Sequence, residues 1–359
     1  MDALTTPLNW QRVKLGDILT LKHGRDYKKF KLGNIPVYGS GGYMLSINNF
    51  LHNGESVCIG RKGTIDKPIY LNGKFWVVDT LFYSYSFKKS IPKFIFYAFS
   101  IIKWSNYNEA TGVPSLTKMT ISNIEIPLPP LNEQIAIANV LSDVDRYLYS
   151  LDALILKKES VKKALSFELL SQRKRLKGFT QAWQRVRLGD ICEIVKGQQI
   201  NKISLNNTDK YPVINGGIDF LGYTNKFNVS KNTIAISEGG TCGYVRFMTS
   251  DFWSGGHNYS LQKISNKVNN LCLYHILKSY EKDIMKLGVG SGLKNIQLKA
   301  LKDFEILLPP LNEQAAIANI LSGLDHEIIS LKNKKRQFEN IKKALNHDLM
   351  SAKIRVLKK

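Results

Sequence analysis

Hydrophobic residues recur at helical spacing in two parts of this chain of 359 residues. From residue 137 to residue 155 they follow at alternating steps of four and three, the pattern of a helix that packs on a second helix in a coiled coil. The stripe then changes phase, which predicts a stutter, and continues through Leu154, Val161, Leu165 and Leu169. A second stripe runs through Ile317, Leu321, Leu324, Ile328, Leu331, Phe338, Ile341, Leu345 and Leu349. Two long helices are therefore predicted.

Prolines and glycines set the limits of these helices. The pairs Pro129-Pro130 and Pro309-Pro310 impose an extended backbone just before each stripe begins. No Pro or Gly interrupts the first helix after residue 130, so we expect it to continue until Gly178 ends it. Glu133 falls in its first turn, where a negative charge complements the helix dipole.

The segments that precede the helices show short apolar runs separated by turns rich in Gly, Asn and Lys. Residues 56–59 and 75–78 are typical of strands, residues 91–103 predict a short helix behind the sheet, and residues 124–128 predict a closing strand. This mixture indicates a domain of α/β (α+β) character before each long helix.

The chain is internally duplicated. Residues 129–142 return at 309–322 with only two differences, and the segment from Trp10 to Ile18 matches that from Trp183 to Ile191. The loops between these matches differ, for example 60–63 against 237–240. A shared scaffold with divergent loops indicates two related modules with different ligands. We predict four parts, namely domains at 1–128 and 178–308 and helices at 129–177 and 309–359.

Charge and cysteine usage narrow the class of partner. The formal net charge of +22 favours a polyanion such as nucleic acid, because neutralised phosphates release counterions. The four cysteines lie far apart and predict buried free thiols rather than zinc or redox pairs. The first residues do not resemble a signal peptide, and no apolar run is long enough to span a bilayer, so a cytoplasmic location without membrane contact is expected.

The order of these parts resembles the specificity (S) subunits of type I restriction-modification enzymes. The resemblance covers nearly the whole chain and is carried by Pro-Pro-Leu-Asn-Glu-Gln at 129–134 and 309–314 and by the two Trp openings. It implies two target recognition domains that read the halves of a bipartite site in double-stranded DNA. It also implies that two long antiparallel helices, related by a pseudo-two-fold axis, set the spacing of those halves. The helices would further dock two methyltransferase (M) subunits and, in complexes that contain them, restriction/translocase (R) subunits.

Catalysis is assigned by this resemblance to the partner subunits. The chain would carry no cofactor, with S-adenosylmethionine, ATP and Mg bound elsewhere in a DNA adenine methyltransferase/endonuclease. The sequence motifs agree with a non-catalytic chain. Neither a Walker loop nor an amino-methyltransferase signature is present, and the glycines of 288–292 lack the context of a nucleotide site. Two alternatives stay open: a self-contained DNA methyltransferase, and a basic coiled-coil structural protein.

Candidate DNA contacts lie on loops, where Arg and Lys can address guanine, Asn and Gln adenine, and Glu cytosine. In the first domain they are His23, Arg25, Tyr27, Lys28, Lys29, Lys31, Ser40, Arg61 and Lys62. In the second they are Lys196, Gln198, Gln199, Lys202, Asn215, Glu238, His257, Asn258, Lys294 and Asn295. Candidate partner contacts lie in the repeated motif, at Glu133, Gln134, Glu313 and Gln314.

Two further groups of residues allow two interpretations each. Trp76 and Trp253 could stack on bases, but their place in strand-like runs favours core packing. The basic runs 173–175 and 353–359 suit either phosphate contact or the C-terminal end of a helix.

Overall fold

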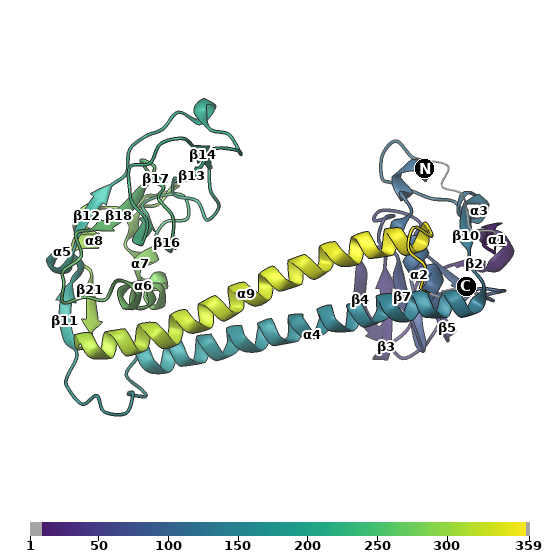
Figure 1. Ribbon diagram of the computed structural model, residues 1–359, viewed down its shortest axis with the longest axis horizontal. Coiled ribbons are helices and arrows are strands. Elements are labelled where there is room, and N and C mark those ends of the chain that lie inside the picture. The colour runs from purple at the N-terminus through teal and green to yellow at the C-terminus, as the bar shows by residue number, and fades with distance from the viewer. Residues whose placement is uncertain (1–8, 357–359) are drawn as a thin grey trace. The chain divides into compact units, whose positions relative to one another are not determined.

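The computed structural model describes residues 9–356, and the chain divides into two compact units. One unit is Met1–Asp152 with Asn333–Lys359, and the other is Ala153–Lys332. Each unit combines one mixed α/β domain with part of both long helices, α4 (Leu131–Leu170) and α9 (Leu311–Met350) (Figure 1). The units therefore divide the chain within the helices, whereas the predicted parts kept each helix whole.

The domain of the first unit contains two four-stranded sheets. One is antiparallel, in the order β2-β9-β6-β7, and the other, β4-β3-β8-β5, contains the parallel pair β3 and β8. Helix α2 packs on β6 and β7, which confirms the short helix predicted behind the sheet. The bounds are β1 (Gln11–Lys14), α1 (Leu15–Ile18), β2 (Thr20–His23), β3 (Leu32–Gly39), β4 (Gly42–Ile47), β5 (His52–Asn53), β6 (Ser56–Gly60), β7 (Ile69–Leu71), β8 (Lys74–Val77), β9 (Leu81–Tyr85), α2 (Pro92–Ile101), η1 (Trp104–Tyr107), α3 (Lys118–Asn123) and β10 (Glu125–Leu128).

The domain of the second unit repeats this plan. Its antiparallel sheet has the order β12-β18-β15-β16, and a second sheet, β14-β13-β17, again contains one parallel pair. In both domains the first strand pairs with the last, β1 with β10 and β11 with β21. The bounds are β11 (Gln184–Arg187), α5 (Leu188–Ile191), β12 (Glu193–Lys196), η2 (Lys202–Ser204), β13 (Tyr211–Ile214), β14 (Gly222–Thr224), β15 (Thr233–Ser237), β16 (Val245–Met248), β17 (Trp253–Ser254), β18 (Asn258–Gln262), α6 (Asn270–Ser279), α7 (Glu281–Lys286), β19 (Gly288–Val289), β20 (Asn295–Ile296), α8 (Leu298–Lys302) and β21 (Glu305–Leu308).

Aromatic residues of the strands fill the domain cores. Phe75, Trp76 and Phe252 are buried, and the indole of Trp76 donates a hydrogen bond of 2.7 Å to the carbonyl of Arg25. The half-buried Trp253 makes the equivalent bond to the carbonyl of Gln198 at 3.0 Å. Core packing is therefore confirmed for Trp76, and in both domains the indole ties the loop after the first sheet strand to the second sheet.

The seam between α4 and α9 keeps one phase, so the predicted stutter is wrong. Leu154 and Val161 are each 39% exposed, and Ile341 is 51% exposed. The steps of four and three continue instead through the partly buried Lys158 and Lys162. Lysine stems can cover apolar surface while the ammonium group reaches a carboxylate, so in the second unit the packed face of α4 includes lysines that a hydrophobic pattern does not count.

Ion pairs show that the two helices run antiparallel within each unit. In the second unit Lys158 pairs with Glu327 and Lys162 with Asp325, each at 2.5 Å. In the first unit Lys342 pairs with Asp145 at 2.5 Å and Lys335 with Asp152 at 2.7 Å. In each unit, an α4 residue with a higher number pairs with an α9 residue with a lower number. This order confirms the predicted antiparallel pairing.

Helix α4 ends at Leu170, so the prediction that it continues to residue 177 is wrong. Gln172 adopts a left-handed conformation with φ of 60°, and the amide of Lys174 donates to the carbonyl of Glu168 at 3.1 Å. This helix stop turns the chain away and brings Arg175 to the first turn of α9. Within residues 9–356, no helix has the length and apolarity needed to cross a membrane.

Candidate nucleic-acid interface

A hollow of about 700 Å³ lies in the first domain beside the end of β6. Arg61 and Lys62, directly after β6, line it together with His23 of β2. The segment 115–119, which leads into α3, also lines the hollow. The amide of Leu116 donates to the carbonyl of Arg61 at 2.9 Å, which fixes this segment against the loop. Three predicted contacts are thus brought together in one concave site.

The lining of this hollow carries cations and no carboxylate. Arg61, Lys62 and Lys118 face it, while Val113 and Met119 add exposed apolar surface. The guanidinium of Arg61 makes one bond, from Nη1 to the carbonyl of Asp79 at 3.1 Å, among the described residues. Its remaining donors suit a phosphate or the acceptor atoms of a base edge.

The second domain builds the corresponding site with different chemistry. Lys196 faces Tyr259 across the β12–β18 ladder, as His23 faces Phe82 across β2–β9. Glu238 follows β15 as Arg61 follows β6, and is 8% exposed. Its Oε1 accepts hydrogen bonds from Lys196 Nζ at 2.6 Å and from the Tyr259 hydroxyl at 3.2 Å.

The second carboxylate oxygen of Glu238, Oε2, has a different environment. Oε2 is buried and has no hydrogen-bond partner within the described residues, and His257 Nδ1 lies 3.8 Å from it. Burial, with the adjacent charge of Glu238, raises the pKa of Tyr259 to about 12, so the phenol stays a hydrogen-bond donor. The exposed Asn295 lies over Gly239, where an added Cβ would come within 2.3 Å of its Oδ1.

The other candidates of the first domain are accessible and remain predictions. Arg25, Lys28, Lys29 and Lys31 are exposed, and Tyr27 and Ser40 are half-buried. Ser40 borders the Arg61 loop, because a Cβ on Gly63 would meet its Oγ at 3.1 Å.

In the second domain one candidate is corrected. Asn258 is 2% exposed, and its amide donates to Ser254 Oγ at 2.9 Å and to the carbonyl of Tyr259 at 3.0 Å, so it supports the strand and does not face DNA. Asn215 is half-buried and accepts a hydrogen bond from the amide of His257. The remaining candidates are exposed, namely Gln198, Gln199, Lys202, His257 and Lys294.

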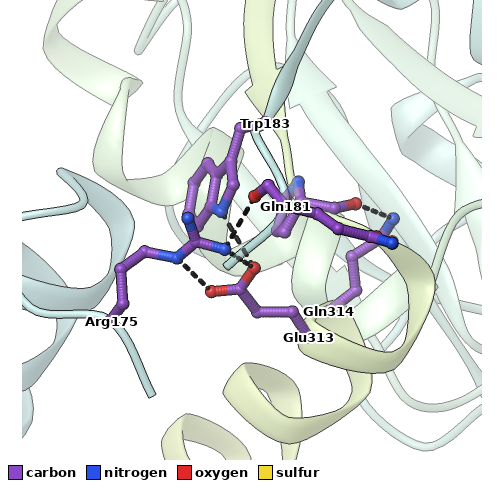
Figure 2. A network of polar contacts seen from close by, with 6 residues as sticks. Arg175, Gln181, Trp183, Glu313 and Gln314 are labelled. Atoms are coloured by element: carbon purple, nitrogen blue, oxygen red, sulfur yellow. Dashed lines mark hydrogen bonds and ion pairs between the residues drawn. The ribbon is translucent and has the colours of Figure 1, made fainter. Parts of the chain in front are cut away.

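The assignment of Glu133, Gln134, Glu313 and Gln314 as partner contacts is also corrected, because all four are at most 2% exposed. Figure 2 shows the network of the second unit, in which Glu313 binds Arg175 and the indole of Trp183. Arg175 donates to both carboxylate oxygens, at 2.8 and 2.6 Å, and also to the carbonyl of Gln181 at 2.9 Å.

The first unit repeats this network. Glu133 accepts from the Trp10 indole at 3.1 Å and from Arg355 Nη2 at 2.8 Å. Arg175 and Arg355, one from each basic run, thus bind the first-turn glutamate of the opposite helix, whereas Arg173 is exposed. Lys358 and Lys359 lie outside the described residues. We call Trp183, Glu313 and Arg175, with their counterparts Trp10, Glu133 and Arg355, the Trp-Glu-Arg locks.

The glutamine of the motif fastens a different part of the domain. Gln314 Nε2 donates to the carbonyls of Pro309 at 2.8 Å and Lys267 at 3.1 Å, and its Oε1 accepts from the amide of Asn269 at 2.7 Å. Gln134 binds the carbonyls of Pro129 and Lys89 and the amide of Ile91 in the same way. The repeated motif therefore joins each domain to the helix that follows it.

The sequence interpretation missed two groups of residues at the candidate site and at the helix ends. Residues 110, 113 and 115–119 line the first hollow, and no motif in the sequence marked them. The lock arginines could have been found from the repeat, because Arg175 and Arg355 share the register shift of the two motifs.

The described residues contain no group of three or more His, Cys, Asp or Glu arranged to hold a metal ion. All four cysteines are free and buried, which confirms that prediction. Burial raises the pKa of the Cys58 and Cys272 thiols to about 12, so they stay protonated and unreactive.

Comparison with known proteins identifies the family. The model for the type I restriction modification DNA specificity domain matches twice, over residues 7–158 and 180–340. A putative type I restriction enzyme MjaX specificity subunit of Methanocaldococcus jannaschii is 31% identical over 292 residues, covering 74% of this chain and 68% of the relative. The chain belongs to the type I restriction-modification specificity subunit family, whose members are generally non-catalytic.

Two further matches concern the sequence and the fold, respectively. A putative type I specificity subunit of Mycoplasma pneumoniae is 38% identical over 162 residues, an alignment that spans 43% of the chain and 43% of the relative, less than half of each. The crystal structure of a type-I restriction-modification system S subunit from M. genitalium has the same fold, with a TM-score of 0.77 over 97% of both chains at 20% identity.

Proposed function

We propose that this chain is the DNA-reading subunit of a type I restriction-modification complex and that each domain reads one half of a bipartite target. The observation that carries the proposal is the pair of equivalent sites after β6 and β15, which share backbone geometry and differ in side chains. Two copies of one scaffold with different polar groups suit two different half-sites.

The paired helices are proposed to set the gap between the half-sites and to dock two methyltransferase subunits, joined in some complexes by a restriction/translocase subunit. Both helices have 40 residues and join their domains through the same buried motif. The methyltransferase subunits would therefore bind the exposed faces of the helices, because the four motif side chains are buried in contacts within the chain.

The chain is proposed to be non-catalytic alone and to work in the cytoplasm with its DNA. S-adenosylmethionine, ATP and Mg would be bound by the partner subunits of an adenine methyltransferase/endonuclease. Calorimetry with S-adenosylmethionine tests this, and tight binding by the purified chain would contradict it.

Methylome sequencing of cells that carry this chain with its methyltransferase subunit tests the central proposal. We expect one bipartite motif with a fixed gap, and cells that carry the methyltransferase alone should lack it. A continuous motif, or methylation that does not depend on this chain, would refute the proposal.

The spacing role has its own test. One heptad inserted into each helix lengthens it by about 10 Å at 1.5 Å per residue, which equals about three base pairs. The gap should widen while both half-site sequences stay the same. An unchanged gap in an active complex would exclude the helices as the spacer.

A further inference from the structure

We propose that Arg61, which follows β6, and Glu238, which follows β15, each read a base. The two domains would read opposite hydrogen-bonding groups at this shared position. Arg61 would take an acceptor edge, that of guanine, and Glu238 would take the amino group of cytosine or adenine. This inference rests on the proposed function and adds the chemical class of one base position in each half-site.

The two positions are equivalent in backbone geometry. The amide of Arg61 donates to the carbonyl of Thr80 at 2.8 Å, and the amide of Glu238 donates to that of His257 at 2.9 Å. The carbonyl of each residue accepts a bond of 2.9 Å, from Leu116 and from Ile296. Each residue follows directly on the third strand of its antiparallel sheet, β6 or β15. A ligand that docks on both domains alike would therefore meet both side chains at corresponding places.

The surroundings of Arg61 are rich in cationic donors and contain no carboxylate among the lining residues that the structure describes. The hollow contains Lys62 and Lys118. An arginine has five N–H donors and no acceptor, and one donor is occupied by the carbonyl of Asp79. The guanine edge in the major groove offers two acceptors, O6 and N7, which an arginine can bind together.

The surroundings of Glu238 leave one acceptor free. Lys196 and Tyr259 occupy Oε1, whereas Oε2 is buried without a partner in the described part of the chain. A buried carboxylate oxygen without a donor costs free energy, which an incoming N–H group would recover. His257 lies beside it, and its side chain is 54% exposed, so a rotation of the imidazole can open the site.

An ionised carboxylate accepts hydrogen bonds and cannot donate them, so it discriminates between base edges. It attracts the amino groups of cytosine N4 and adenine N6 and repels the carbonyl oxygens of guanine and thymine. A purely structural role for Glu238, as the ion-pair partner of Lys196, would leave Oε1 engaged but would not account for the free Oε2.

The test is the methylome of the complete complex with Glu238→Gln and with Arg61→Gln. Glu238→Gln keeps the shape and adds a donor, so one amino-bearing position of one half-site should relax, with discrimination falling about 5- to 150-fold. Arg61→Gln should relax a guanine position in the other half-site by a similar factor. Glu193→Gln is the matched control, because Glu193 pairs with Lys263 on the exposed surface of the same sheet, and no change is expected.

The outcomes separate this inference from the proposed function. A wild-type complex without a bipartite motif would refute the function itself. A bipartite motif that neither variant alters, in complexes of normal yield, would refute the base-reading inference alone. Should Glu238→Gln fail to fold, Arg61→Gln still decides, because the Arg61 side chain is only half-buried and its guanidinium bonds to one backbone carbonyl among the described residues.

Discussion

Replacement of Arg175 by methionine would remove the cation from a Trp-Glu-Arg lock while keeping most of the side-chain volume. Glu313 is 1% exposed and would lose two charge-assisted hydrogen bonds, leaving the Trp183 indole as its donor. Removal of one partner from a buried ion pair costs about 3–5 kcal/mol. Because the Arg175 side chain is itself 25% exposed, we expect the lower end, about 3 kcal/mol.

Native-state hydrogen exchange of the Trp183 indole and of the β11 and β21 amides measures this cost locally. Arg185→Met is the control, since its pair with Glu305 is exposed and should be worth about 0–1 kcal/mol. Addition of Glu313→Gln to Arg175→Met removes the unpaired buried charge and should restore most of the loss. A loss for Arg175→Met no larger than that of the control would refute the lock as an anchor of the second domain.

Three further predictions concern pH, the helix seam and salt. Burial lowers the pKa of His275 to about 4, so the unfolded chain takes up its proton first and stability should fall by about 2–3 kcal/mol as the pH drops from 6.5 to 4.5. Tyr97 is the counterpart of His275 in the first unit, because its hydroxyl lies 3.1 Å from Ser142 Oγ as His275 Nε2 lies 3.1 Å from Ser322 Oγ. Urea unfolding of His275→Tyr at both pH values should therefore show a smaller loss, and an unchanged loss would show that His275 is not its source. In the seam, Ile155→Ala should lower the free energy of unfolding by about 2–5 kcal/mol and Leu154→Ala by less than about 1 kcal/mol. The reverse order in urea unfolding would support a stutter in α4. A plot of log K against log salt for a random duplex should be steep, and Lys62→Met should reduce its slope by about one if Lys62 touches a phosphate.

The internal duplication allowed the two long helices and the two domains to be predicted from the sequence. Identical motifs located both helix starts, and the Pro-Pro pairs placed them because backbone rules act locally. The phase of the seam was misread because Lys158 and Lys162 occupy core-facing positions, where a hydrophobic pattern counts them as polar. Their role depends on Glu327 and Asp325, which are more than 160 residues away.

The sequence predicted the candidate site only in part, because some of its residues are placed by contacts with distant parts of the chain. Loop residues such as Arg61 and Lys62 were found because charge next to glycine marks an accessible turn. Burial of Glu133 and Glu313 was not foreseen, since a glutamate in a first helical turn is usually solvated, and the arginines that neutralise them lie after the far ends of the opposite helices. Such pairings are set by tertiary contact and leave no local signal.

Apolar side chains of each domain pack against the helix that follows it, but the hydrogen bonds of the motif glutamines at this joint do not involve domain side chains. Gln134 and Gln314 bind the main chain at Lys89 and Ile91 and at Lys267 and Asn269, so different residues present the same carbonyl and amide. The lock adds a single tryptophan from each domain. A foreign domain that kept this tryptophan, the turn before α2 or α6 and an apolar face toward the helix would fit at the same place, so recombination could exchange whole domains without redesign of the helices.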